Sequence, residues 1–176
     1  MFKIIALVLL AVVALVLSIA AAQPDQFRVE RSTRIQAPPE RVFALINDLQ
    51  QMKRWNPYEH KDPRLKGEFG PTTSGPGATY AWDSSEVGQG RMTIVSATAP
   101  TQVQMRLDFI KPFAAVNTAE YLLRPDAGGT RVTWAMFGPA PFFSKLMQTF
   151  ISFDRMIGRD FEDGLQRLKA LAETPA

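Results

Sequence analysis

The only histidine of the chain, His60, lies among side chains that could carry acid–base chemistry. The stretch reads KRWNPYEHKDP, and the carboxylates of Glu59 and Asp62 flank the imidazole. An imidazole that titrates near neutral pH beside an orienting carboxylate is the usual arrangement of a general base. However, consecutive loop residues do not point at one another by default, and exposed polar side chains are normal in loops. We therefore interpret this stretch as a loop between Pro57 and Pro63 and assign no catalytic residue.

Composition excludes several other kinds of site. The chain of 176 residues has no cysteine, which excludes disulfides, thiolate zinc sites and cysteine nucleophiles. A single histidine excludes a multi-histidine metal site. An all-carboxylate Mg²⁺ or Ca²⁺ site is still allowed, but the acidic residues show no EF-hand-like spacing. Lysine and arginine are scattered, with a net charge of +3, and form no basic groove for a nucleic acid. We predict no metal, no cofactor and no nucleic-acid partner; the oligomeric state stays open.

The elements that would position a site follow from the hydrophobic pattern. Alternation predicts a first strand at 27–35, and helical spacing after Pro38 predicts a helix from Pro39 to residue 47 or 48, then a short one over 52–55. A long irregular connection rich in glycine and proline follows. Further alternating segments predict strands at 78–83, 90–97, 102–109, 117–124 and 130–137.

The last part of the chain changes to a helical period. Apolar residues recur every three or four positions from Leu146 to Leu168, which predicts one long amphipathic helix, broken near Gly158. Asp154 and Asp160 fall outside the apolar stripe, so we expect them to pair with Arg155 or Arg159 on a solvated face.

This order of elements predicts an α+β fold in which an antiparallel meander buries one face against the C-terminal helix. A strongly curved sheet wrapped around one helix can leave a cavity between sheet, helix and loops. Methionine and aromatic side chains on the inward face would suit an apolar ligand, although an ordinary core uses the same residues. Nine positions are candidates for the lining: Trp82, Met92, Met105, Phe109, Tyr121, Trp134, Met136, Phe153 and Ile157.

One polar position shares a strand face with a candidate for the lining. Asn117 lies on the same face of its predicted strand as Tyr121, so the two could orient a ligand through a polar group. The alternative is that both point outward to water.

The N-terminus has the pattern of a membrane segment. Residues 4–22 carry no charge, and this run is nearly long enough to cross the hydrocarbon core of a bilayer as a helix. The alternative is a cleaved signal sequence, because Ala20, Ala21 and Ala22 fit a cleavage site; the run is long for that role. Lys3 favours an extracytoplasmic domain at a bacterial inner membrane, whereas the arginines just after the run favour the opposite topology.

The sequence also resembles the START-like (SRPBCC) superfamily and its bacterial polyketide cyclase/dehydratase-type members. The segments that carry the resemblance lie between residues 27 and 173: IQAPPERVFALINDL, WNPY, GATYAWDS, GQGRMTIVSATAP, FIKPF, GGTRVTWAMFG and MIGRDFEDGLQRLKALAE. The resemblance implies the helix-grip fold, in which about seven strands wrap around the last helix, and a deep apolar cavity for lipids, quinones, sterols or polyketides. The seventh strand is then expected between Lys61 and Phe69. Because catalytic members use different residues, no catalytic role is carried over.

The hydrophobic run gives an anchor or signal (1–23) and the polar residues after it a linker (24–26), and the resemblance makes the remainder a ligand-binding domain (27–176). It also places the loop that holds Trp55 and Tyr58 over the cavity mouth, so both join the candidate lining, Trp55 as a plug and Tyr58 at the entrance. The alternative for both is plain packing at the base of the loop.

Three functions follow as hypotheses. The first, which we favour, is a membrane-tethered binding or carrier domain for a hydrophobic small molecule such as a lipid, a quinone or a polyketide-like compound. The second is a cyclase/dehydratase- or hydrolase-type enzyme acting on such a ligand, and whether catalysis occurs is left open. The third is a protein-interaction module like the co-chaperone relatives of the superfamily, which would have a filled core and an exposed apolar patch.

Overall fold

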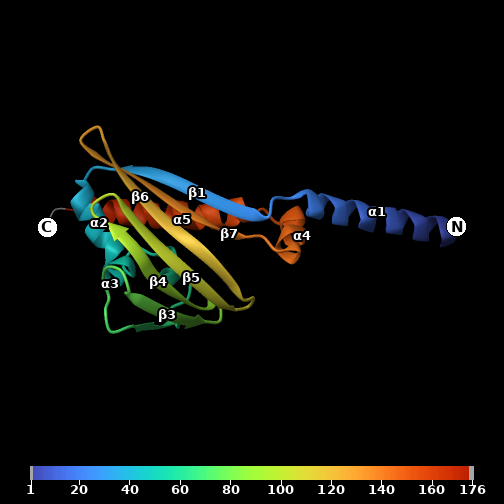
Figure 1. Ribbon diagram of the computed structural model, residues 1–176, viewed down its shortest axis with the longest axis horizontal. Coiled ribbons are helices and arrows are strands. Elements are labelled where there is room, and N and C mark those ends of the chain that lie inside the picture. Colours follow the sequence, from blue (N-terminus) through green and yellow to red (C-terminus); the bar gives the residue numbers. More distant parts are fainter. Residues whose placement is uncertain (1, 175–176) are drawn as a thin grey trace.

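One antiparallel sheet of seven strands forms the body of the domain in the computed structural model, which describes residues 2–174 (Figure 1). The sheet order is β1-β7-β6-β5-β4-β3-β2, so only β1 departs from the order of a simple meander. The strands are β1 (Gln26–Ile35), β2 (Lys66–Phe69), β3 (Thr79–Ser84), β4 (Gly88–Thr98), β5 (Gln102–Lys111), β6 (Ala115–Asp126) and β7 (Gly129–Pro139). The predicted α+β class and curved sheet are therefore confirmed, and β2 is the seventh strand expected between Lys61 and Phe69.

The long strands follow from the alternation in their sequences. Alternate side chains are buried at Ala119, Tyr121 and Leu123 of β6, and β7 buries Val132, Trp134 and Met136 on the same face of the sheet. The turn between these strands contains Ala127 and Gly128, with φ angles of 48° and 82°. Such a turn matches the twist of an antiparallel pair and fixes the register, in which Tyr121 lies opposite Trp134.

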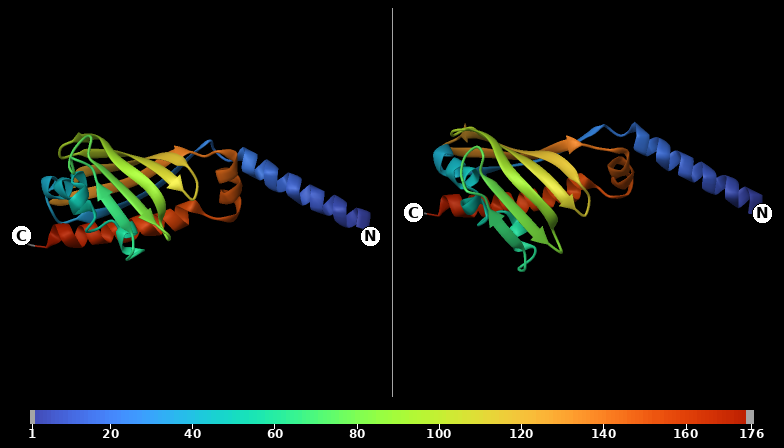
Figure 2. Two further views of the ribbon diagram at one scale, coloured as in Figure 1. Left: turned by 90° about the horizontal axis from the view of Figure 1, so that it is seen from below. Right: turned by 60° about the horizontal axis from the view of Figure 1, so that its bottom comes forward.

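Helices cover the inner face of the sheet, with α2 and α3 at one end and α5 along its length (Figure 2). The connection after β1 forms α2 (Pro39–Asn47), α3 (Leu49–Met52) and the 3₁₀-helix η1 (Pro57–His60). The second short helix thus begins earlier than predicted, because the side chain of Asp48 caps it by accepting a hydrogen bond from Gln50 N. The C-terminal helix α5 (Phe153–Glu173) runs along β1 and is gripped by the curved sheet.

The predicted single helix after Pro141 is wrong in one respect. The structure divides it into α4 (Phe142–Phe150) and α5, and the break lies at Ile151 and Ser152 rather than near Gly158. Ser152 starts α5 because its hydroxyl accepts a hydrogen bond from Arg155 N at 3.2 Å. Gly158 lies within α5, where it makes room for an arginine side chain of β1: a Cβ atom there would lie 2.0 Å from Arg31.

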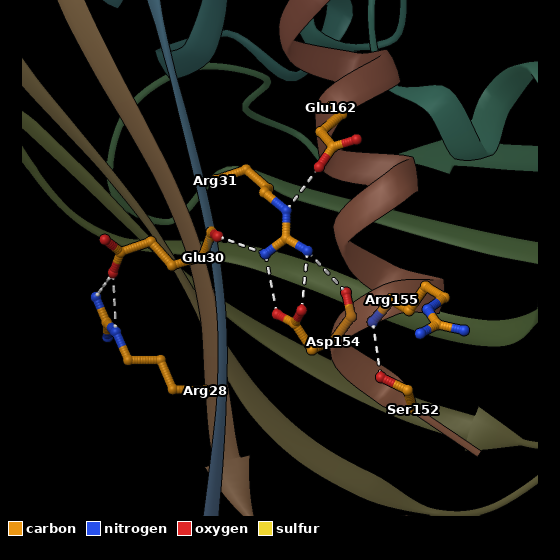
Figure 3. A network of polar contacts seen from close by, with 7 residues as sticks. All are labelled: Arg28, Glu30, Arg31, Ser152, Asp154, Arg155 and Glu162. Carbon is orange, nitrogen blue, oxygen red and sulfur yellow. Dashed lines mark hydrogen bonds and ion pairs between the residues drawn. The ribbon is translucent and has the colours of Figure 1, made fainter.

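That arginine ties the edge strand to the first turns of α5 (Figure 3). The guanidinium of Arg31 donates hydrogen bonds to the carboxylate of Glu162 at 2.8 Å and to that of Asp154 at 2.9 and 3.0 Å. It also donates to the backbone oxygens of Glu30 and Asp154. Asp154 therefore pairs with β1 instead of with Arg155 or Arg159, the pairing expected from the sequence.

The Arg31 contact predicts how stability depends on pH. The hydrogen bonds from Arg31 hold the pKa of Asp154 below its ordinary value of 3.8. Asp154 therefore binds a proton more readily in the unfolded chain than in the folded one. The contact stabilises the folded state above pH 3.8, and this stabilisation is lost as pH falls through the lower pKa of Asp154 in the folded state. We expect Asp154→Asn to lower the thermal unfolding midpoint at neutral pH and to flatten its fall below about pH 4.

Thermal unfolding of the full chain in detergent, followed by circular dichroism across this pH range, measures the effect. Asp163→Asn is the matched control, because Asp163 lies on the same helix but, among the residues that the structure describes, pairs only with Arg167, one turn away. Equal acid profiles for the two variants would contradict the prediction.

The N-terminal helix α1 (Phe2–Ala22) extends away from the domain (Figure 1). It is the one helix among the described residues that is long and apolar enough to cross a membrane, with a mean hydropathy of 3.2, and only 6% of its most apolar window is buried. A signal sequence near an N-terminus would have the same properties. Ala20, near the end of α1, is fully buried.

Candidate functional site

A cavity of about 320 Å³ lies between the concave face of the sheet, α5 and the η1 segment. The side chains around it are mostly apolar or aromatic. They come from strands β3 to β7, from α3, η1 and α5, and from the loops next to these elements. The lining residues are Met52, Asn56, Tyr58, Glu59, Lys61, Leu65, Tyr80, Trp82, Glu86, Val87, Met92, Met105, Leu107, Phe109, Ala119, Tyr121, Trp134, Met136, Met156, Ile157, Asp160 and Phe161. An enclosed apolar cavity with a few polar groups is typical of small-molecule sites.

Nine of the twelve candidate lining residues surround this cavity. They are Tyr58, Trp82, Met92, Met105, Phe109, Tyr121, Trp134, Met136 and Ile157. The other three lie elsewhere. Trp55 is fully buried behind the wall, Asn117 packs over Gly138, and Phe153 is half-buried at the start of α5. Tyr121 thus faces the cavity, whereas Asn117, on the same face of β6, does not contribute to its lining.

Stacked aromatic rings build the wall between the sheet and α5. The ring of Trp134 stacks on Phe161 of α5 with centroids 4.0 Å apart and on Tyr121 at 5.2 Å. Trp55 packs edge-on against both Tyr121 and Trp134 and donates its indole N–H to the backbone oxygen of Leu45 at 2.9 Å. Trp55 is therefore a core residue that supports the wall, and the fixed rings make the cavity preformed.

Charged side chains gather at the mouth of the cavity. Lys61 Nζ lies 2.7 Å from a carboxylate oxygen of Asp160 and 5.1 Å from the ring centre of Tyr58. The carboxylate of Glu59, whose side chain is only 7% exposed, lies 3.6 Å from Lys53 Nζ. Asp160 was expected on a solvated face. That expectation is wrong, because α5 turns Asp160 toward the η1 segment, where Lys61 compensates its charge.

The three tyrosines of the cavity are neutral phenols at physiological pH. Burial raises the pKa of Tyr58, with a further contribution from Asp160, and burial also raises the pKa of Tyr80, with a further contribution from Glu59. Burial raises the pKa of Tyr121 as well. Each group can therefore donate its O–H in a hydrogen bond, but none supplies a phenolate base.

Three buried polar atoms of the cavity lining have no hydrogen-bond partner within residues 2–174. They are Trp82 Nε1, Trp134 Nε1 and Tyr80 Oη. Buried polar groups in native proteins are nearly always paired, and an unpaired donor costs about 1–3 kcal/mol. Two of the three are indole N–H groups, which can only donate. The cavity lining thus includes two indole side chains whose N–H groups are unpaired within the described residues, a signal that the sequence alone does not contain.

His60 lies outside this arrangement. The single turn of η1 directs Tyr58 and Glu59 to the cavity, whereas His60 at its end is exposed. Asp62 is buried and accepts hydrogen bonds from Ser84 Oγ at 2.7 Å and from Arg64 N at 2.9 Å. These two bonds hold the loop in place, and they lower the pKa of Asp62. Asp62 thus acts on the backbone of the loop and does not orient the imidazole.

A second, wider depression of about 730 Å³ lies on the opposite face of β2–β5. It is open to solvent, and charged side chains that alternate with the inward residues line much of it, such as Lys66, Asp83 and Arg91. The smaller, more apolar cavity on the concave face is therefore the better candidate for an apolar ligand.

A curved sheet that grips its C-terminal helix around an apolar cavity defines a START-like domain. The chain belongs to the family described as polyketide cyclase / dehydrase and lipid transport, whose model matches residues 26–173. No curated protein sequence matches the chain.

Solved structures share the fold at low sequence identity. KanY covers 85% of this chain and 99% of its own, with 17% identity and a TM-score of 0.63. CV1439 from Chromobacterium violaceum covers 87% and 100%, with 14% identity and a TM-score of 0.60. Ms6760 from Mycobacterium smegmatis covers 82% and 89%, with 19% identity and a TM-score of 0.57.

Proposed function

We propose that the protein is a membrane-tethered binding or carrier domain for an apolar small molecule that bears a hydrogen-bond acceptor. The observation that supports this most directly is the cavity of about 320 Å³, whose mostly apolar lining includes two indole side chains without a hydrogen-bond partner among the described residues. The family description, which includes lipid transport, agrees with such a ligand. Lipids, quinones and polyketide-like compounds all carry carbonyl oxygens of the required kind.

The tether is the second part of the proposal. We propose that α1 is retained as a membrane span and that the domain lies on the extracytoplasmic side of a bacterial inner membrane. The absence of charge between residues 4 and 22 and the full length of α1 support the membrane span, and Lys3 before it favours the extracytoplasmic side for the domain.

Native mass spectrometry of the full chain, extracted gently from membranes, tests both parts. We expect one apolar molecule per chain and an N-terminus that still includes α1. A chain that begins near Gln23 would contradict the tether, and a chain without any bound apolar molecule would contradict the carrier function.

The unpartnered indoles predict a preference that can be measured. The unaltered chain should bind methyl nonyl ketone more tightly than undecane, because only the ketone accepts a hydrogen bond. Trp82→Phe and Trp134→Phe keep an aromatic ring but remove the donor. At least one of them should reduce this preference by about tenfold, since an unpaired buried polar group costs about 1–3 kcal/mol.

Competition binding with the two compounds measures the ratio of their affinities. Trp55→Phe is the matched control, because the indole N–H of Trp55 is already bonded to Leu45 and lies outside the cavity lining. A ratio unchanged in both cavity variants would contradict the assignment of the donors.

An enzymatic role is the alternative for which a specific observation exists. The mouth contains two carboxylates, Glu59 and Asp160, close to two phenols. Carboxylates and phenols beside an apolar cavity could transfer protons to and from a bound ketone. A chemically unchanged ligand after prolonged incubation with the protein would argue against this alternative.

A further inference from the structure

Exposed apolar side chains form a patch at one end of the domain. Six of them belong to α4, to Ile151 directly after it, to the turn between β5 and β6, and to the start of β6. We name this set the α4 patch: Phe113, Val116, Phe142, Phe143, Phe150 and Ile151. The rings of Phe113 and Phe143 contact each other, with centroids 5.5 Å apart, so the patch is continuous between the two elements. Phe150 is 71% exposed and Phe113 66%. Large aromatic groups that remain exposed in this way mark an interaction surface.

The α4 patch lies beside the end of α1. The C-terminal end of α1 contacts α4, and both views in Figure 2 show α4 next to that end while the rest of α1 extends away. Two contacts fix this arrangement. The Nζ of Lys145, on α4, lies 2.5 Å from the carboxylate of Asp25, and Ala140 N donates to the backbone oxygen of Asp25 at 2.7 Å. Only residues 23–25 separate α1 from β1. If α1 spans a bilayer, the α4 patch must therefore lie close to its surface.

The mouth of the cavity opens at the same end of the domain. In an antiparallel meander successive turns alternate between the two ends of the sheet, so the β3–β4 and β5–β6 turns share the end at which β1 begins. Glu86 and Val87, at the β3–β4 turn, line the cavity together with Met156 in the first turn of α5. Met156 is 54% exposed, and it links the cavity lining to the surface near the patch.

We propose that the α4 patch docks on the lipid bilayer that holds α1, and that this contact places the cavity mouth at the membrane surface. The proposal rests on the proposed function, because it requires α1 to be a membrane span. Its partner is the bilayer and not another protein, since the patch continues the apolar surface of α1 and is held next to it by Asp25 and Lys145. An apolar molecule could then pass between bilayer and cavity without crossing bulk water.

Depth-dependent fluorescence quenching tests this contact in the full chain. Because the chain has no cysteine, single cysteines can carry a fluorophore without other changes. Phe143→Cys and Phe150→Cys report on the α4 patch. Leu10→Cys reports on α1, and Val95→Cys is the matched control, because Val95 is an exposed apolar residue in the half of β4 that lies away from the patch. The labelled chains are reconstituted in vesicles of phosphatidylethanolamine and phosphatidylglycerol, with and without a lipid that carries a nitroxide just below its head group.

We expect the labels at positions 10, 143 and 150 to lose most of their fluorescence to the lipid-borne quencher, and the label at 95 to keep it. If the label at position 10 loses its fluorescence while the labels at 143 and 150 are quenched no more than the label at 95, the docking is overturned but the tether is kept. No loss at position 10 would overturn the tether, and the docking with it.

Two further measurements exclude other causes. In the first, the labels at 143 and 150 are exposed to aqueous iodide, and unlabelled Phe143→Cys chains are tested for disulfide cross-links. If the labels are shielded from both the lipid quencher and iodide and the chains cross-link, the patch binds a second copy of the chain, and the proposal is overturned. Near-ultraviolet circular dichroism identical to that of the unaltered chain shows that each labelled variant is folded.

Discussion

Ala119→Trp should abolish binding of the apolar ligand and leave the domain folded. Ala119 lies on β6 in the middle of the concave face, directly opposite Met105 of β5 and Met136 of β7. All three residues line the cavity, and Ala119 is the smallest of them. An indole at this position would occupy much of a cavity of about 320 Å³. We expect the affinity to fall by about a hundredfold or more, which corresponds to about 3 kcal/mol.

The fold should tolerate this change because the new ring fills existing space. Extra atoms destabilise a protein mainly where the core is already well packed. The fraction of chains that carry a bound molecule, measured by native mass spectrometry, reports the loss. Ala81→Trp is the matched control, since Ala81 lies on β3 and lines only the depression on the opposite face. Unchanged ligand occupancy in Ala119→Trp would contradict a ligand site in the cavity.

Trp55→Ala should produce the largest loss of stability among single substitutions of the site region. The side chain is fully buried, packs edge-on against two rings of the cavity wall and donates a hydrogen bond to Leu45. Removing a buried tryptophan costs about 3–5 kcal/mol through lost burial and the space left behind. For a chain of this length the thermal unfolding midpoint should fall by about 10 °C.

Trp55→Phe separates packing from hydrogen bonding. It keeps most of the ring but leaves the backbone oxygen of Leu45 without its donor, so a loss of about 1–2 kcal/mol is expected. Thermal unfolding of both variants in the same detergent gives the comparison. Equal midpoints for Trp55→Ala and Trp55→Phe would show that the ring does not support the cavity wall.

Much of the sheet could be predicted because its information is local. Alternation in QVQMRLDF and TRVTWAMF placed Met105 and Trp134 on the inward face, where the structure has them. β2 is only four residues long and three of these residues are exposed, so its pattern is weak. Its place came from the resemblance to the superfamily and not from periodicity.

The pairing of charges could not be predicted, because the partners lie far apart in the sequence. Arg31 and Asp154 are 123 positions apart, and Lys61 and Asp160 are 99 apart. From the sequence, the nearest opposite charges on the same helix are the natural partners. Only the packing of α5 against β1 and η1 shows which carboxylates pair with residues of other elements.

The division between α4 and α5 was missed for a related reason. The apolar spacing continues through Ile151, although the helix ends there and a new helix begins after the cap at Ser152.

The Arg31 contact makes the two edges of the sheet unequal in rigidity. At one edge, β1 is bonded along its length to β7 and is also joined to α5 through side chains. At the other, β2 has four residues, a single neighbouring strand and a loop that contributes Leu65 to the cavity lining. Local opening is least costly where few contacts must break. We therefore expect local opening of the sheet to cost less free energy at the β2 edge than at the β1 edge, where α5 is also held.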